Sequence, residues 1–156
     1  LYQVMKDYII ATDGAYSPAR NQGGIGIVIA DINYNVLQQG SHCFKSKNDN
    51  PYTDITNQTM EIIAALTALK SIKKPIHSLL VLSDSMYVIG NASLGWKPKK
   101  NVKLIERFKS EIVRAQSLVE TPIKFQWVKG HQSNPSRLDF LNTICDKLAN
   151  DASKSI

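Results

Sequence analysis

The sequence has few cysteines, no long apolar run and no low-complexity tract. Its two cysteines, Cys43 and Cys145, cannot form a disulfide framework and lack the paired spacing of a zinc site. The longest apolar stretch, around residues 62–69, is far shorter than the roughly 20 residues that span a bilayer. No charged leader followed by an apolar segment and a small-residue cleavage site opens the chain, so we expect no secretion signal. These absences predict a reduced, cytoplasmic protein that does not bind membranes.

Acidic residues are outnumbered, since 13 Asp and Glu stand against 19 Lys and Arg in 156 residues, a formal net charge of +6. A chain of this length buries roughly 68–70% of the surface that it exposes when unfolded, which is enough for one core. We therefore expect a single domain over residues 1–156. The 43% hydrophobic and 21% charged content argues against disorder, collagen and coiled coil. The positive excess favours a polyanionic partner, although many basic proteins bind no nucleic acid.

The pattern of apolar residues changes along the chain from short β-rich runs to alternating helices and strands. Strands are expected over residues 6–12, 25–32, 35–44, 79–82 and 123–128, and helices over 56–72, from 85, over about 102–116 and over 141–152. Asp13-Gly14 and Gly23-Gly24 are typical of turns, and Thr56 or Asn57 can cap the first helix. This βββαβααβα order, with an antiparallel start, predicts a mixed sheet covered by helices.

Four carboxylates occupy positions that a structural role explains poorly. Asp13 and Asp84 each follow an apolar strand, at the sheet edge where open α/β proteins bind ligands. Glu61 interrupts an otherwise apolar helix, and Asp146 lies in the last helix. Taken singly, each has a structural explanation: a turn dipeptide, a helix cap, an acid favoured by the helix dipole, or a solvated helix face.

Taken together, these residues predict a metal site. A strand end, its parallel neighbour and the helix between them bring Asp13, Asp84 and Glu61 into one small volume. Carboxylates this close repel one another, and a divalent cation removes that penalty. Oxygen ligands suit Mg²⁺ or Mn²⁺, and two such ions about 3.5–4 Å apart promote in-line phosphoryl displacement.

Six collinear blocks of the sequence resemble the successive motifs of ribonuclease H type 1. They are ATDGAY at 11–16, TNQTMEIIAALTALK at 56–70, SDSMYV at 83–88, WKPKKNVKLIERF at 96–108, FQWVKGHQSNP at 125–135 and CDKLAN at 145–150. The resemblance implies a ribonuclease H-like α/β fold: a five-stranded mixed sheet of order 3-2-1-4-5, its first three strands antiparallel, with helices on both faces. It also implies an endonuclease that cleaves the RNA strand of RNA/DNA hybrids by two-metal-ion catalysis, leaving 5′-phosphate and 3′-hydroxyl ends.

The resemblance also assigns roles to individual residues. The family's metal-binding tetrad falls on Asp13, Glu61, Asp84 and Asp146, which would hold two Mg²⁺ or Mn²⁺ ions. His131 matches the family's loop histidine, which would pass a proton during water attack or product release; by position alone it is a solvated loop residue. Family positions that contact the RNA strand or border the scissile phosphate correspond to Gly14, Asn57, Gln58 and Asn142, otherwise a turn glycine, helix-cap residues and a surface amide.

A basic stretch follows Trp96. Residues 97–109 hold six basic side chains against one acidic residue: Lys97, Lys99, Lys100, Lys103, Arg107 and Lys109 against Glu106. An aromatic ring beside cations can pack on sugar while lysines neutralise phosphate, so we expect Trp96, Lys97, Lys99 and Lys100 to bind substrate in a salt-sensitive way. A solvated face is the alternative.

The chain departs from the family pattern in its spacing at two places, and Met86 stands where the family often has a polar residue. The short spacing from Asp84 to Lys97 indicates that the helix and basic loop of many members are shortened or absent, and residues 137–140 are expected as an insertion before Asp146. A noncatalytic nucleic-acid-binding module of the same fold stays an alternative, as does a DNA-cutting transposase, integrase or resolvase. The expected partner is an RNA/DNA hybrid, and the protein is expected to be a monomer or a domain of a longer polypeptide.

Overall fold

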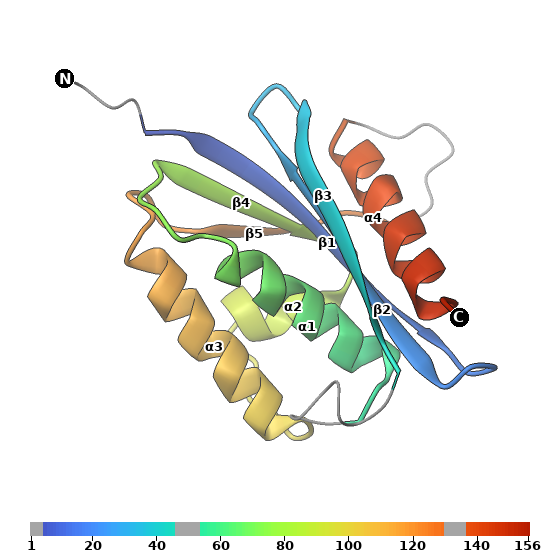
Figure 1. The fold of residues 1–156 in the computed structure, drawn as a ribbon. Helices are drawn as coiled ribbons and strands as arrows, with labels where there is room; N and C mark the ends of the chain where they lie inside the picture. Colours follow the sequence, from blue (N-terminus) through green and yellow to red (C-terminus); the bar gives the residue numbers. More distant parts are fainter. Residues whose placement is uncertain (1–4, 46–53, 130–136) are drawn as a thin grey trace.

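A computed structural model describes residues 5–45, 54–129 and 137–156 of the chain. Within these residues the strands and helices follow the order predicted from the sequence (Figure 1). They are β1 (Asp7–Ser17), β2 (Gln22–Ala30), β3 (Val36–Phe44), α1 (Asn57–Lys70), β4 (Ser78–Ser83), α2 (Met86–Ser93), α3 (Val102–Gln116), β5 (Lys124–Trp127) and α4 (Arg137–Ser153).

The strands form one five-stranded sheet of order β3-β2-β1-β4-β5, which confirms the expected topology. The β1–β2 and β2–β3 pairs are antiparallel, and the β1–β4 and β4–β5 pairs are parallel. The parallel pairs need crossover connections, and α1 supplies the one between the antiparallel strands and β4. Because β1 and β4 are parallel neighbours, their carboxyl ends lie side by side at one edge of the sheet.

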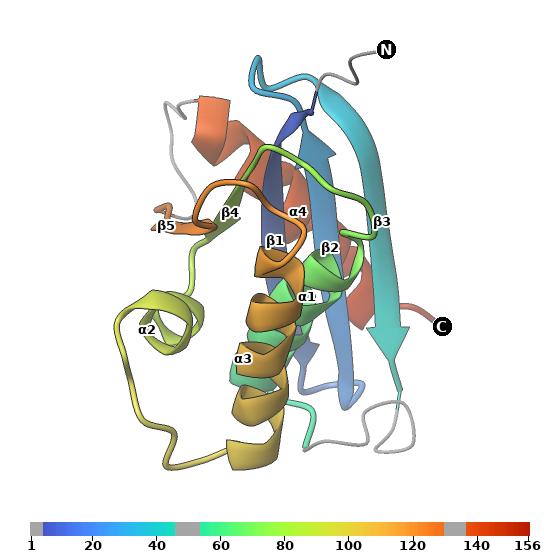
Figure 2. The same ribbon diagram turned by 90° about the vertical axis from the view of Figure 1, so that its left-hand side faces the viewer.

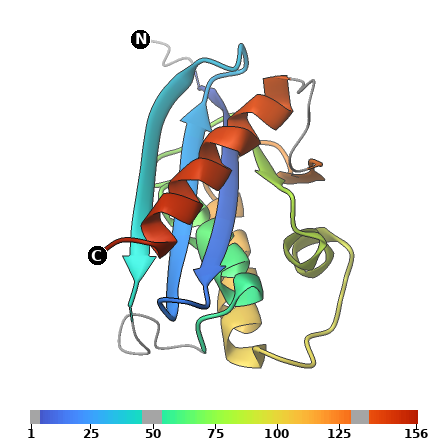
Figure 3. The same cartoon turned by 90° about the vertical axis from the view of Figure 1, so that its right-hand side faces the viewer.

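Helices cover both faces of the sheet. Helix α1 packs against one face, with α3 beside it (Figure 2), and α4 lies across β1 and β2 on the other (Figure 3). Side chains alternate along β1, so Ile10 belongs to the core under α1 and α3, whereas Ile9 belongs to the core under α4. No helix in the described ranges has both the length and the apolar character that a membrane crossing requires.

Strand β1 does not end at Asp13-Gly14, so the turn expected there is wrong. β1 continues to Ser17 because β2 pairs with it throughout, with Asp13 opposite Gly26. The pairing of β1 with β4 stops earlier, at Ala11 and Leu82. Asp13 is thus inside a strand but just beyond the last pair that β1 makes with β4.

Gly23 and Gly24 also lie inside a strand, so the second expected turn is wrong as well. A Cβ atom added at Gly24 would lie 2.2 Å from the carbonyl oxygen of Ala149, and one added at Gly26 would lie 2.4 Å from that of Cys145. These glycines therefore allow the backbone of α4 to approach β2 closely. The expected insertion at residues 137–140 is part of α4, which begins at Arg137.

Candidate active site

Three carboxylates come together at the end of the β1–β4 pairing. Asp13 belongs to β1, Glu61 to α1, and Asp84 follows the last residue of β4. Each offers a carboxylate oxygen, and these oxygens all lie within 4.8 Å of one another. The clustering predicted from the sequence is therefore present in the fold.

Glu61 owes its position to the start of α1. Thr56 caps the helix: its Oγ1 accepts from Thr59 N at 3.1 Å, and Thr59 Oγ1 accepts from Thr56 N at 2.9 Å. This arrangement is a reciprocal capping box, so Asn57 is not the cap. Because α1 starts at Asn57, Glu61 lies beyond the first turn, and the helix-dipole explanation for this acid does not apply.

Gly14 lets α1 approach β1 closely enough for Glu61 to meet Asp13. A Cβ atom at Gly14 would lie 2.3 Å from the carbonyl carbon of Met60 and 2.4 Å from Glu61 N. The amide nitrogen of Gly14 donates to Asp13 Oδ1 at 2.9 Å and to Glu61 Oε1 at 3.2 Å. One backbone N–H therefore orients two carboxylates.

Asp84 lies between β4 and α2 and is not the cap of α2. Ser85 is the cap, and its Oγ accepts from Val88 N at 3.4 Å. Ser85 N in turn donates to Ser83 Oγ at 3.1 Å. The structural explanation for Asp84 as a helix cap is therefore wrong, and its carboxylate takes part in the cluster.

Asp146 approaches the cluster from α4, on the opposite face of the sheet. Its Oδ1 accepts from Asn150 Nδ2 at 3.1 Å, and its side chain is partly buried. A side-chain hydrogen bond with Asp13 is one of the causes that raise the pKa of Asp13. Asp146 thus borders the three clustered carboxylates without belonging to the closest group.

Burial and mutual repulsion raise the pKa values of two of these acids, Asp13 and Glu61. The pKa of Asp13, whose side chain is 3% exposed, is raised first by burial and then by repulsion from Glu61. The pKa of Glu61 is raised first by burial, while hydrogen bonds from Asp13 and from Gly14 N oppose the rise. Two such groups a few ångströms apart cannot both ionise cheaply.

The donor set fits a divalent cation. Glu61 Oε2 is buried and has no hydrogen-bond partner among the described residues. A buried carboxylate oxygen without a partner is costly, and a cation beside it removes the cost. The ligand atoms that the cluster offers are all oxygens, as hard cations such as Mg²⁺ or Mn²⁺ prefer. Asp13, Glu61 and Asp84 can therefore hold a metal.

Several residues expected to bind substrate meet at a hollow of about 500 Å³ beside the start of α1. Asn57, Gln58 and Lys100 all line it, although Lys100 comes from the link before α3. Asn57 Oδ1 accepts from Tyr16 N at 3.0 Å, which fixes its side chain against the end of β1. Tyr16 and Asn101 also line the hollow, and sequence reasoning missed both. Tyr16 could have been found as the last residue of the ATDGAY block.

Trp96 is held on the surface in the link between α2 and α3. Its indole lies directly on Gly90, where an added Cβ would meet the ring at 2.1 Å. Trp96 N donates to Gly90 O at 3.2 Å, and Lys109 Nζ donates to Trp96 O at 3.1 Å. The side chain remains 43% exposed, and Lys97 and Lys99 beside it are exposed too. The link contains no helix, as the short spacing from Asp84 indicates.

Two assigned residues do not join this surface. Asn142 is 2% exposed in α4, so the surface amide considered as the alternative is wrong, and its contact with substrate stays a prediction. Its Oδ1 has no hydrogen-bond partner among the described residues. His131 lies outside the described residues, and its role stays a prediction.

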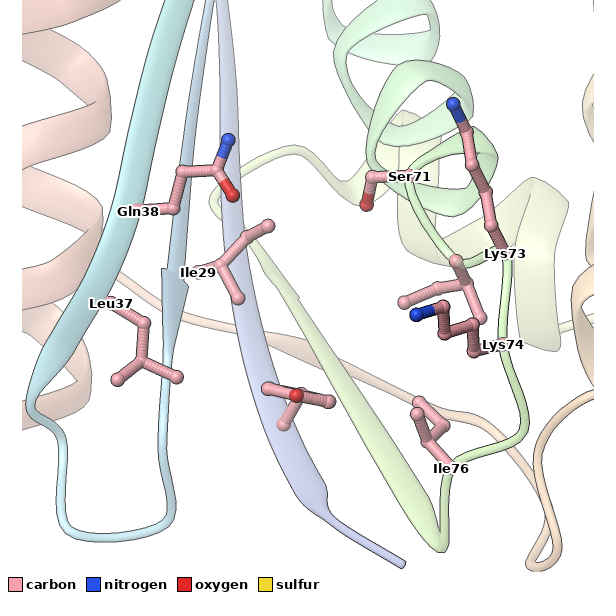
Figure 4. A pocket seen from close by; sticks show the side chains of 9 residues that line it. Ile29, Leu37, Gln38, Ser71, Lys73, Lys74 and Ile76 are labelled. Atoms are coloured by element: carbon pink, nitrogen blue, oxygen red, sulfur yellow. The ribbon is translucent and has the colours of Figure 1, made fainter.

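A second hollow, of about 370 Å³, is separate from the carboxylates. It lies between β3 and the chain that follows α1, with Leu37 and Gln38 on one side and Lys73, Lys74 and Ile76 on the other (Figure 4). Glu61 is near the opposite end of α1. This hollow therefore takes no part in the acidic site.

Known proteins resemble this chain over nearly its whole length. The ribonuclease H of Syntrophomonas wolfei is 34% identical over 160 residues, covering 97% of this chain and 99% of its own. LC11-RNase H1, solved in complex with an RNA/DNA hybrid, superposes with a TM-score of 0.70 at 23% identity over 93% of this chain and 95% of its own. The N-terminal RNase H domain of a Mycobacterium tuberculosis protein, solved as a fusion with maltose binding protein, gives 0.69 at 23% identity over 95% and 94%.

The similarity covers all the strands and helices that position the carboxylates. The family model named RNase H matches residues 5–154, which include every strand and helix described above. Asp13, Glu61, Asp84 and Asp146 all fall within the matched range. The chain therefore belongs to the RNase H family.

Proposed function

We propose that this protein is an endonuclease that hydrolyses the RNA strand of RNA/DNA hybrids with the help of Mg²⁺ or Mn²⁺. The observation that carries the proposal is the cluster of Asp13, Glu61 and Asp84, whose oxygens lie within 4.8 Å of one another in a member of the RNase H family. The relatives that are named ribonuclease H, and the LC11 enzyme that binds a hybrid, support the substrate class.

The acidic residues would act by binding and orienting a cation. Asp13, Glu61 and Asp84 would supply oxygen ligands. Asp146 would supply another from α4, on the other face of the sheet. When bound, divalent ions stabilise the charge that develops on the phosphate and favour the ionised form of an attacking water. The Gly14 N–H keeps Asp13 and Glu61 in place, because it donates to both carboxylates. His131 would assist proton transfer, as its motif position predicts.

The surface beside the cluster carries side chains that can bind the 2′-hydroxyl groups, phosphates and sugars of a hybrid. Asn57 and Gln58 are exposed amides that can meet 2′-hydroxyl groups, which distinguish RNA from DNA. Lys100 in the same hollow can neutralise a phosphate, and the exposed indole of Trp96 can pack against a sugar. We expect Lys97 and Lys99 to add non-specific attraction.

A cleavage assay with three matched substrates tests the proposal. The wild-type protein with Mg²⁺ should cut the labelled RNA strand of a hybrid and leave duplex DNA and duplex RNA of the same sequence intact. Asp84→Asn, which keeps the size of the side chain, should abolish cleavage while the protein still binds the hybrid. Cleavage of duplex DNA would favour a DNA-cutting enzyme, and binding without any cleavage by the wild type would favour a noncatalytic module.

Three further expectations belong to the same proposal. Mg²⁺ is the ion that we expect in the cell, because it suits oxygen ligands and binds phosphates. We expect a monomer that works in the cytoplasm, in keeping with cysteines that form no disulfide among the described residues. The Mycobacterium tuberculosis relative is an N-terminal domain, so this chain too is proposed to work alone or as part of a longer polypeptide.

A further inference from the structure

A tryptophan at the end of β5 contacts the backbone of Asp84. The indole Nε1 of Trp127 donates to the main-chain carbonyl oxygen of Asp84 at 3.0 Å. β5 is the edge strand next to β4, so this hydrogen bond joins the sheet edge to a member of the carboxylate cluster. The contact involves the backbone carbonyl group of Asp84 and not its carboxylate.

The backbone on either side of Asp84 is held by other hydrogen bonds. Trp127 is paired with Ser83 in the β4–β5 register, and Val128 N donates to Ser83 O at 2.9 Å. On the other side, Ser85 caps α2. Asp84 lies between them, outside both the strand and the helix. The indole N–H therefore restrains the residue at which the chain changes direction, where a small rotation would move the carboxylate.

Packing fixes only part of the Trp127 side chain. Its side chain is 45% exposed, and hydrophobic stabilisation scales with the apolar area removed from water. The other tryptophan, Trp96, is exposed to a similar degree, but no hydrogen bond of its indole nitrogen is seen in the described structure. The specific contact of Trp127 is thus the one that its N–H makes with Asp84.

We propose that Trp127 is a positioning residue for the metal site, acting through the carbonyl group of Asp84. Mutation of the partners that orient metal ligands typically lowers metal affinity or activity by roughly 10–100-fold. With its carbonyl fixed by the indole, the Asp84 carboxylate is directed toward Asp13 and Glu61 before a cation binds. This inference rests on the proposed metal-dependent function and adds a residue that touches neither the metal nor the hybrid.

Binding of Mn²⁺ to the full chain, followed by the electron paramagnetic resonance signal of free Mn²⁺, tests the inference without an activity readout. Trp127→Phe keeps an aromatic ring and removes the N–H, and it should weaken Mn²⁺ binding about tenfold. At saturating metal, its KM for the hybrid should match that of the wild type. Trp96→Phe is the matched control: it should leave Mn²⁺ affinity unchanged and raise the KM for the hybrid.

A second comparison separates positioning from a general loss of structure. In an Asp84→Asn background the carbonyl contact is retained but the ligand is gone, so Trp127→Phe should no longer change Mn²⁺ affinity. The inference is overturned if Trp127→Phe weakens Mn²⁺ binding equally in both backgrounds. It is also overturned if the Mn²⁺ affinity of Trp127→Phe alone stays within twofold of wild type. If Trp127→Phe does not fold, Trp127→Met replaces it, and failure of both to fold makes the role structural and refutes positioning. Absence of Mn²⁺ binding by the wild type refutes the metal site itself.

Discussion

The amide nitrogen of Gly14 donates to Glu61 Oε1 at 3.2 Å, joining the middle of β1 to the second turn of α1. The same residue lacks the side chain that would separate the two elements, since an added Cβ would lie 2.4 Å from Glu61 N. A single glycine thus provides both the space and the hydrogen bond that set the distance between Asp13 and Glu61. This dual role makes Gly14 a test of how tightly the acidic site depends on the packing of α1.

Gly14→Ala should destabilise the protein and inactivate it. The new methyl group meets backbone atoms of Met60 and Glu61, which cannot rotate away, so α1 must move. We expect a loss of about 2–3 kcal/mol in the free energy of unfolding, measured by urea denaturation. Gly40→Ala is the matched control, because an added Cβ there has nothing within 4 Å. Equal stability of the two variants would show that the site tolerates movement of α1.

Asp13→Asn should make the metal-free protein more stable while removing its activity. Because the pKa of Asp13 is raised, folding at pH 8 must either protonate this buried carboxyl or bury its charge; the neutral amide avoids both costs and keeps an oxygen for the Gly14 N–H. We expect the thermal midpoint at pH 8 to rise by about 3 °C without metal, as about 1 kcal/mol produces in a protein of this size. Scanning calorimetry with a chelator measures it. A lower midpoint would mean that the carboxylate stabilises the fold.

The stability of the metal-free protein should fall as the pH rises above about 4, the ordinary range of carboxylates. The folded-state pKa values of Asp13 and Glu61 are raised, so the folded chain holds more protons than the unfolded chain and loses stability as those protons leave. His77 adds a loss of the same sign, because Asp7 raises its pKa. Urea denaturation from pH 4.5 to 8 should therefore be repeated in a His77→Gln background.

Saturating Mg²⁺ should reverse most of the loss at pH 8, because the cation replaces the missing protons. The Asp13→Asn, Glu61→Gln double variant is the control and should show a flatter pH profile and little response to Mg²⁺. A wild-type profile that stays flat from pH 4.5 to 8 would contradict the raised pKa values.

Lys100→Ala should weaken binding of the hybrid in a salt-dependent way. Lys100 lines the hollow that also holds Asn57 and Gln58, and it can pair with one phosphate. The plot of log KM against log salt should lose about one unit of slope, which corresponds to one phosphate contact. Lys74→Ala, at the separate hollow beyond α1, should leave the slope unchanged. If both variants behave alike, the attraction comes from overall charge and not from a defined contact.

Sequence patterns predicted the order of elements because apolar periodicity reflects which side chains are buried. The pattern could not predict where β1 ends. Asp13-Gly14 favours a turn locally, but nine consecutive pairs with β2, from Ile9 to Ser17, outweigh that preference. The turn predicted at Gly23-Gly24 failed for a related reason, since Gly24 lies where α4 approaches β2 too closely for a side chain.

The candidate site was predicted to a similar extent. The clustering of Asp13, Glu61 and Asp84 followed from topology, because a parallel pair and its crossover helix must meet at one edge. The burial of Asn142 could not be predicted from topology, because it depends on which face of α4 packs against the sheet. That helix begins at Arg137 and not at residue 141 as predicted. Side-chain contacts such as that of Trp127 with the Asp84 carbonyl leave no periodic signal in a sequence.

The four acidic residues come from β1, α1, the end of β4 and α4, which together extend over almost the whole chain. During synthesis, the last of them, Asp146, is added only after the other three, when the chain has reached α4. A growing chain that has folded its first three strands and α1 would still lack both Asp84 and Asp146. The acidic site would therefore be assembled only after α4 has been made, so that a growing chain without this helix cannot complete it.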